Sequence, residues 1–104
     1  MPTVVVATMT AKPESVDEVR AACAKAIAAV HQEPGCELYA LHEADGTFVF
    51  VEQWTDADAL KTHSTAPAVL ELFGTVGELL DGAPDIKVLE PVIAGDADKG
   101  RLRP

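Results

Sequence analysis

The pattern of apolar and polar residues along the chain predicts four strands and two helical regions. Residues 4–10 form a β-branched apolar run, which is typical of a strand buried on both faces or nearly so. Residues 36–43 and 47–54 predict two more strands, and the Asp-Gly pair between them is the strongest short signal for a hairpin turn. Residues 85–93 predict the last strand, in which Pro91 indicates an edge position or a bulge.

The first helical region lies between the first two strands. It begins at a capping-box pattern, residues 15–18, and apolar residues then recur at helical spacing up to Val30. Pro34 and Gly35 end this helix. His31 in the last turn complements the helix dipole, and we prefer that structural interpretation to a catalytic one.

The second helical region follows the hairpin and has two parts. A cap at residues 55–58 opens a short helix, and Pro67 begins a second one at a position where a first turn tolerates proline. The apolar period of the second part continues to Leu80. Gly74 and Gly77 disfavour a helix interior, so they indicate a bend or the close approach of a neighbour.

The hairpin register follows if Asp45 and Gly46 form a two-residue turn, and Tyr39 then faces Glu52. One surface of the hairpin carries Tyr39, Leu41, Phe48, Phe50, Glu52 and Trp54. The other surface carries Leu38, Ala40, His42, Val49, Val51 and Gln53. Both surfaces are largely apolar, so both need to be covered.

The order β-α-β-β-α-β predicts an α+β fold, the ferredoxin-like arrangement with an antiparallel sheet. Two helical regions cover one face of such a sheet, and nothing in 104 residues remains to cover the other. A second copy that packs sheet against sheet would bury the second face, and exposed apolar patches of that size are rare in monomers. We therefore expect a homodimer. A monomer with one unusually apolar face is the alternative.

Length and charge narrow the classes of function. A chain of 104 residues forms one domain, which we place at residues 1–94, followed by a flexible polar tail over residues 95–104. The net charge of −9 argues against nucleic acid or a membrane surface as partner, because phosphates favour Lys and Arg. The chain shows no leader pattern and no apolar run of transmembrane length, so we expect a cytoplasmic protein. Cys23 and Cys36 are expected to be thiols rather than a disulfide.

Candidate chemistry is confined to one cluster. The three histidines lack metal-ligand spacing, and the sequence contains no phosphate-binding loop and no nucleophile elbow, so we expect no metal site. By the predicted register Tyr39, Glu52 and Trp54 share one surface, and His63 follows one short helix later. Such a group is typical of an apolar pocket with a few polar members.

Each member of this cluster also has a structural interpretation. A carboxylate on an apolar surface must be paired, hydrogen-bonded or protonated, so for Glu52 the alternative is a salt bridge or a capping role within the dimer interface. Trp54 is more often a core anchor than a substrate platform, and Tyr39 is interpreted as a core residue whose hydroxyl bonds a neighbour. His63 is either a satisfied surface residue or a base that titrates near neutral pH.

The stretch from residue 33 to residue 67 resembles the antibiotic biosynthesis monooxygenase family of small dimeric α+β-barrel proteins. The shared features are the Glu-Pro-Gly-Cys turn, Tyr39, the strand that ends in Glu52 and Trp54, and His63. The order of elements extends the resemblance over about residues 4–93. It implies oxidation of quinols or polycyclic phenols by O₂ without metal or flavin, although the fold also hosts haem-degrading enzymes and isomerases.

The clustering of five residues, taken with the implied reaction, leads to a hypothesis about their roles. His63 or Glu52 would be the catalytic base that deprotonates the substrate. Trp54 and Phe50 would be flat walls for the substrate ring, and Tyr39 completes the substrate-binding set. No cofactor is implied, and the expected partners are a second copy of the chain, a small aromatic or quinol substrate, and O₂.

Two positions depart from the family pattern, and both bear on substrate contacts. Ala68 stands where many relatives have His or an aromatic residue, and Glu43 stands where many have Arg. The helix expected over residues 66–80 contains no His, so we expect no axial haem ligand from it. Two other functions stay open, which are a non-catalytic dimeric module that binds a small apolar metabolite and an isomerase on the same barrel.

Overall fold

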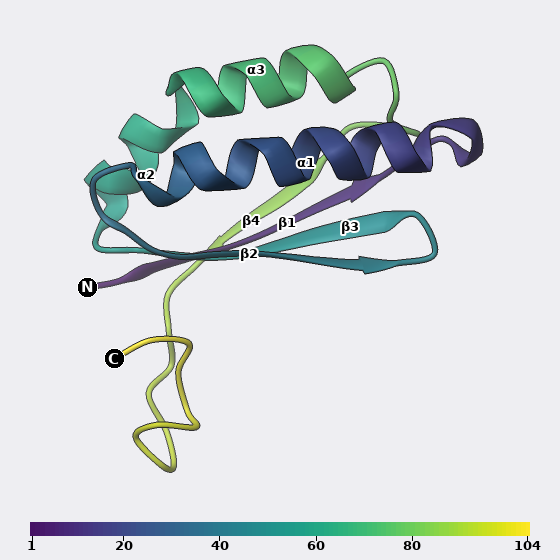
Figure 1. Ribbon diagram of the computed structural model, residues 1–104. Helices are drawn as coiled ribbons and strands as arrows, with labels where there is room; N and C mark the ends of the chain where they lie inside the picture. Colours follow the sequence, from purple (N-terminus) through teal and green to yellow (C-terminus); the bar gives the residue numbers. More distant parts are fainter.

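The computed structural model describes all 104 residues and confirms the predicted α+β, ferredoxin-like arrangement. The elements are β1 (Thr3–Thr10), a short 3-10 turn (Pro13–Ser15), α1 (Val16–His31), β2 (Cys36–Ala44), β3 (Thr47–Trp54), α2 (Ala57–Ser64), α3 (Pro67–Val76) and β4 (Asp85–Leu89). All three α-helices lie on one face of the sheet, and the other face carries no helix (Figure 1). None of these helices combines the length and the apolar character that a membrane crossing needs.

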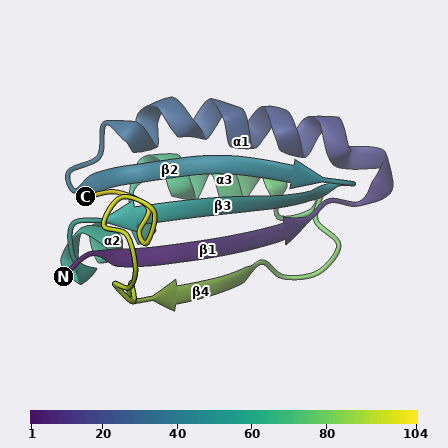
Figure 2. The same cartoon turned by 90° about the horizontal axis from the view of Figure 1, so that it is seen from below.

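The four strands form one antiparallel sheet in the order β2-β3-β1-β4 (Figure 2). β4 lies at the edge, beside β1, as Pro91 indicated. The strand ends at Leu89 rather than at Ile93, because the proline that follows lacks the N–H group that would continue the hydrogen-bonded ladder. The edge position matters for the site, since no strand and no helix covers the outer side of β4.

The β2–β3 hairpin has the predicted register, with Tyr39 opposite Glu52 and Ala44 opposite Thr47. Asp45 and Gly46 have positive φ values of 49° and 81°, as a two-residue turn of type I′ requires. Successive side chains of β3 therefore alternate between the two faces of the sheet, and Glu52 points toward the helices.

The helix ends differ from the prediction in two places. Ser15 is the N-cap of α1, but its side chain makes no capping hydrogen bond, because the preceding 3-10 turn gives it a conformation outside the extended region. α3 ends at Val76 instead of Leu80, because Gly77 disfavours further helix and Leu80 turns to bridge Ala11. A side chain at Gly74 would meet no atom within 4 Å, so no neighbour approaches closely there.

The core lies between the sheet and the helices. Its largest fully buried side chains include Trp54, Phe48, Phe50 and Met9. Cys23 also belongs to this core and Cys36 is half-buried, and both are free thiols, as predicted. Burial raises the pKa of the Cys23 thiol to about 11, so it stays protonated and behaves as a small apolar residue.

The face of the sheet opposite the helices, called here the open face, is apolar and only half-buried. Its apolar members are Val4, Val6, Leu38, Ala40, Val49 and Val51. The chain after β4 passes beneath this face without helix or strand (Figures 1 and 2). The Nε2 atom of Gln53 donates hydrogen bonds to Glu37 Oε1 at 2.8 Å and to the backbone oxygen of Arg103 at 3.3 Å. The tail thus touches one end of the open face.

Candidate active site

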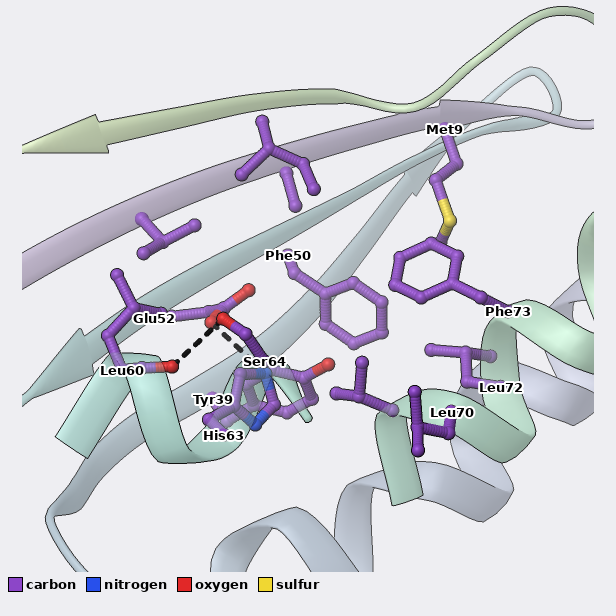
Figure 3. Close-up of a pocket in the computed structure, with 14 residues that line it drawn as sticks. Met9, Tyr39, Phe50, Glu52, Leu60, His63, Ser64, Leu70, Leu72 and Phe73 are labelled. Atoms are coloured by element: carbon purple, nitrogen blue, oxygen red, sulfur yellow. Dashed lines mark hydrogen bonds and ion pairs between the residues drawn. The ribbon is translucent and has the colours of Figure 1, made fainter. Parts of the chain in front are cut away.

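A cavity of about 200 Å³ lies between the sheet and the α2–α3 pair, within one chain (Figure 3). Its lining is predominantly apolar and comes from all four strands and from both of these helices. The polar members are Glu52 from β3 and the neighbouring His63 and Ser64 from α2. The cavity therefore has one polar end in an otherwise apolar space, which is the usual form of a small-molecule site.

The structure brings four of the five predicted site residues to this cavity. Tyr39, Phe50, Glu52 and His63 line it. Trp54 does not line it, because its fully buried indole lies behind His63, with the two ring centres 4.4 Å apart. The cluster is on the helix-covered face, so Glu52 lies within the core of one chain and not on the open face.

α2 positions His63. Asp56 caps the helix by accepting a hydrogen bond from the Ala59 N–H at 2.9 Å, in agreement with the predicted cap. His63 lies in the last turn, on the side that faces the sheet, and is only 7% exposed. Its ring contacts the ring of Tyr39 edge to face, with the ring centres 5.5 Å apart.

The loop between α1 and β2 supplies a residue that the sequence did not reveal as part of the site. Glu33 Oε1 lies 2.7 Å from His63 Nδ1. A carboxylate oxygen only accepts hydrogen bonds, so Nδ1 carries the proton and Nε2 of the neutral ring is free to act as a base. This contact joins residues 30 positions apart, and the only sequence signal for it was the Glu-Pro-Gly-Cys turn itself.

Gly35 brings this loop close enough to α2 for the contact. Its φ of +81° is in the left-handed region, and a Cβ on it would lie 2.5 Å from the Cβ of Ala59. The backbone oxygen of Gly35 accepts a hydrogen bond from the Thr55 N–H at 2.8 Å, which fixes the loop at the start of α2. Only glycine permits both the backbone conformation and the close packing.

Glu52 is 4% exposed, and no Lys or Arg forms an ion pair with it. Its Oε1 accepts a hydrogen bond from the Trp54 indole at 3.0 Å and lies 3.8 Å from His63 Nε2. Burial raises the pKa of Glu52, while the Trp54 hydrogen bond and the nearby His63 lower it by less. Glu52 and His63 are therefore two proton-exchanging groups side by side at the polar end of the cavity (Figure 3).

Tyr39 and Phe50 form the aromatic part of the cavity wall. Their rings are stacked with centres 4.6 Å apart and planes inclined by 27°. Burial raises the pKa of Tyr39, so its phenol is neutral. No protein group hydrogen-bonds the Tyr39 hydroxyl, in contrast to the expectation from the sequence, although no side-chain polar atom is both buried and unpartnered. The hydroxyl is thus not fully buried.

The electrostatics of the site restrict what it can hold. None of the residues that line the cavity is Lys or Arg. No three His, Cys, Asp or Glu side chains come together in a geometry that would hold a metal ion. The arrangement can take a proton from a neutral hydroxyl group or return one to it, in a space lined mostly by apolar side chains. A reaction without a cofactor remains a prediction.

Comparison with known proteins identifies the family. The sequence profile described as "Antibiotic biosynthesis monooxygenase" matches residues 2–74. Rv0793 of Mycobacterium tuberculosis, named a "putative monooxygenase", is 31% identical over 93 residues, which are 88% of this chain and 92% of that protein.

Solved structures agree with this match. The structure of Rv0793 has a TM-score of 0.86 at 30% identity, and the match covers 92% of this chain and 100% of that one. A Caulobacter crescentus structure, described by the same family name, has a TM-score of 0.82 at 29% identity and covers 88% of this chain and 90% of its own. The chain therefore belongs to the antibiotic biosynthesis monooxygenase family.

Proposed function

We propose that the protein is a monooxygenase that oxidises a quinol or a polycyclic phenol with O₂, without metal or flavin. The observation that carries this proposal is the orientation of His63. Glu33 holds its Nδ1 at 2.7 Å, and its Nε2 lies beside Glu52 at the wall of an aromatic cavity. The family membership and the names of the relatives support the same class of reaction.

In the proposed reaction His63 Nε2 takes the proton of the substrate hydroxyl, and Glu33 stabilises the imidazolium that forms. The electron-rich aromatic anion gives one electron to O₂, and the resulting radical pair combines in a new bond between a ring carbon and oxygen. The hydrogen of that carbon leaves as a proton while the O–O bond breaks. One oxygen stays on the ring as a carbonyl, and the other leaves as water, so a quinol plus O₂ gives a hydroxyquinone plus water.

The other site residues have supporting roles in this proposal. Glu52, whose pKa is raised by burial, exchanges the second proton with the substrate. Phe50 and Tyr39 are the flat walls against which the substrate ring stacks. Trp54 acts from behind the cavity, where its indole hydrogen bond holds the carboxylate of Glu52.

Oxygen uptake with a menadiol-type quinol tests the proposal. The protein should consume O₂ above the rate of uncatalysed oxidation, also after treatment with a metal chelator. His63→Ala and Glu52→Ala should each reduce the rate by about a hundredfold or more. His42→Ala, which changes an exposed histidine on the open face, is the matched control.

Unchanged uptake in both site variants would show that the assignment of the base is wrong. Stabilisation by the quinol without any turnover would instead favour a binding module.

We also propose that the protein acts as a homodimer. All the helices cover one face, while the half-buried valines Val4, Val6, Val49 and Val51 line the open face. Packing of two open faces against each other would bury these side chains in a symmetric interface. Sedimentation at micromolar concentration should give the mass of two chains, and the mass of a single chain would contradict this proposal.

The two free thiols agree with the expected reducing compartment of the cytoplasm.

A further inference from the structure

The charge around the cavity indicates an uncharged ligand. The chain has eight Lys and Arg residues, and none of them lines the cavity. Glu52 lines its polar end, and Glu33 lies directly behind His63. A carboxylate or phosphate on a ligand would therefore be buried beside two carboxyl groups with no Lys or Arg to neutralise it, which is unfavourable.

The size of the cavity limits the ring system. Its volume is about 200 Å³. An apolar cavity of about 150 Å³ in another protein holds one benzene molecule. Met9 and Phe73 close the end of the cavity that lies opposite Glu52 and His63 (Figure 3). A ligand with its hydroxyl at the polar end thus has room for one ring or for two fused rings.

The mouth of the cavity lies at the uncovered edge of the sheet. Leu70 on α3 and Ile86 on β4 both line the cavity, although they are 60% and 55% exposed. Val88, two positions further along β4, is on the same face of the sheet and is also 60% exposed. Leu70 and Ile86 thus give the cavity an apolar mouth, and Val88 adds exposed apolar surface on the same face of β4. A hydrocarbon chain is the substituent that such a mouth would stabilise.

We propose that the cavity binds an uncharged hydroxylated aromatic compound of one or two fused rings, and that a hydrocarbon substituent of this ligand extends out of the cavity between Leu70 and Ile86. The hydroxyl of this ligand lies at Glu52 and His63. The inference rests on the proposed function for the reaction, but its binding part is independent of turnover.

Calorimetric titration of the full chain under nitrogen tests the choice of ligand. 2-Naphthol should bind, and 4-hexyl-2-naphthol, whose substituent points sideways from the line between the hydroxyl and the far ring, should bind at least tenfold more tightly. 3-Hydroxy-2-naphthoate should bind at least tenfold more weakly than its neutral amide, which has nearly the same size. 2-Anthrol should bind at least tenfold more weakly than 2-naphthol. Equal affinities within any of these three pairs would overturn the corresponding part of the inference.

Variants locate the ligand in the pocket. Phe73→Ala should raise the affinity for 2-anthrol relative to 2-naphthol at least tenfold, and Phe73→Leu replaces it if the alanine variant does not fold. Leu70→Arg and Ile86→Arg should each bring the affinity ratio of 4-hexyl-2-naphthol to 2-naphthol close to one. Val92→Arg is the matched control, because Val92 is 84% exposed and does not line this cavity. If the affinity ratio stays high in both Leu70→Arg and Ile86→Arg, the hydrocarbon substituent does not pass between these two residues.

This inference and the proposed function can fail separately. Binding in the expected order without O₂ uptake from any quinol would leave the ligand class standing and overturn the monooxygenase reaction. Uptake of O₂ with an anionic or three-ring quinol as fast as with a neutral two-ring quinol would support the reaction and overturn the ligand class.

Discussion

The two faces of the sheet differ in how they are covered, and β3 contributes to both. On the helix-covered face, Phe50 and Glu52 are at most 4% exposed. Glu52 accepts a hydrogen bond from Trp54, and His63 is hydrogen-bonded to Glu33. On the open face, Val49 and Val51 remain half-exposed. The site lies entirely on the helix-covered face. Alternate residues of β3 therefore serve different purposes: one set lines the site, and the other forms the open face.

Each face also buries one polar residue of β3, and these two residues differ in the number of hydrogen bonds that their side chains make. Gln53, on the open face, is neutral and donates to two oxygens, those of Glu37 and Arg103. Glu52, on the covered face, accepts one hydrogen bond, from Trp54. The neutral amide is suited to an interface, whereas a carboxyl group with one donor and a raised pKa is ready to exchange a proton.

The largest expected difference between the faces is in stability. Phe48→Ala removes a fully buried ring on the covered face and should lower the free energy of unfolding by about 3–5 kcal/mol. Val49→Ala, one residue away on the open face, should cost about 1 kcal/mol or less at low protein concentration. Urea unfolding of both variants at the same concentration measures the contrast. Equal losses would show that the open face is packed as tightly as the core.

A charge on the open face should separate association from chemistry. Val49→Asp buries a carboxylate in the proposed interface away from the Lys and Arg of the tail, at a cost of about 3 kcal/mol or more, which weakens the dimer by at least about a hundredfold. Because the cavity lies within one chain, O₂ uptake per chain should persist in the monomer. Sedimentation and oxygen electrode measurements follow the two properties, with Val49→Thr as the control of matched size. Loss of uptake together with the dimer would contradict a site complete in one chain.

Two glutamates near the start of β2, one bonded to His63 and one to Gln53, test the role of Glu33. Glu33→Gln keeps a hydrogen-bonding side chain but removes the charge that stabilises His63 when it is protonated. Hydrogen bonds to charged groups contribute about 1.5–3 kcal/mol, so kcat should fall by about 10- to 100-fold with little change in KM. Glu37→Gln, which alters the partner of Gln53, should leave kcat within about twofold. A lower melting temperature of Glu33→Gln, with kcat per folded molecule unchanged, would mark a purely structural residue.

The smallest expected effect is the pH dependence of stability that comes from Glu52. Its pKa is raised above the ordinary value of 4.5, so the folded protein binds this proton more tightly than the unfolded chain does. The resulting stabilisation is complete below the unfolded pKa and is lost as the pH rises through the folded pKa. Relative to Glu52→Gln, wild type should become less stable over that window in urea titrations between pH 4 and pH 8. The opposite slope would show that ionised Glu52 is stabilised by the fold.

Local patterns predicted most of the fold, and failed where an end depended on packing. The Asp-Gly turn gave the correct pairing of Tyr39 with Glu52, because turn geometry fixes the register. α3 stopped at Val76, and β4 stopped at Leu89, short of the predicted ends. In both cases the apolar residues of the sequence continue beyond the end of the element, while the backbone leaves the helix or the strand. Periodicity alone therefore overestimated the two elements.

The candidate site was predicted in part, since clustering on one strand is a local property and contact between distant segments is not. Register and proximity in sequence grouped Glu52 with Tyr39 and His63. The contact of His63 with Glu33 spans 30 residues and depends on how Gly35 packs against Ala59. Trp54 was grouped correctly with the cluster, but only packing placed it behind His63 instead of in the cavity wall.

The sequence by itself determined the order of the elements, the hairpin register and the two faces of β3, because alternation and turn chemistry act between residues that are close along the chain. The tertiary structure decided which face the helices cover, where the cavity opens and which carboxylate holds His63. These features depend on side chains that meet only after the chain has folded back on itself, so they depend on shape and packing that no local pattern records.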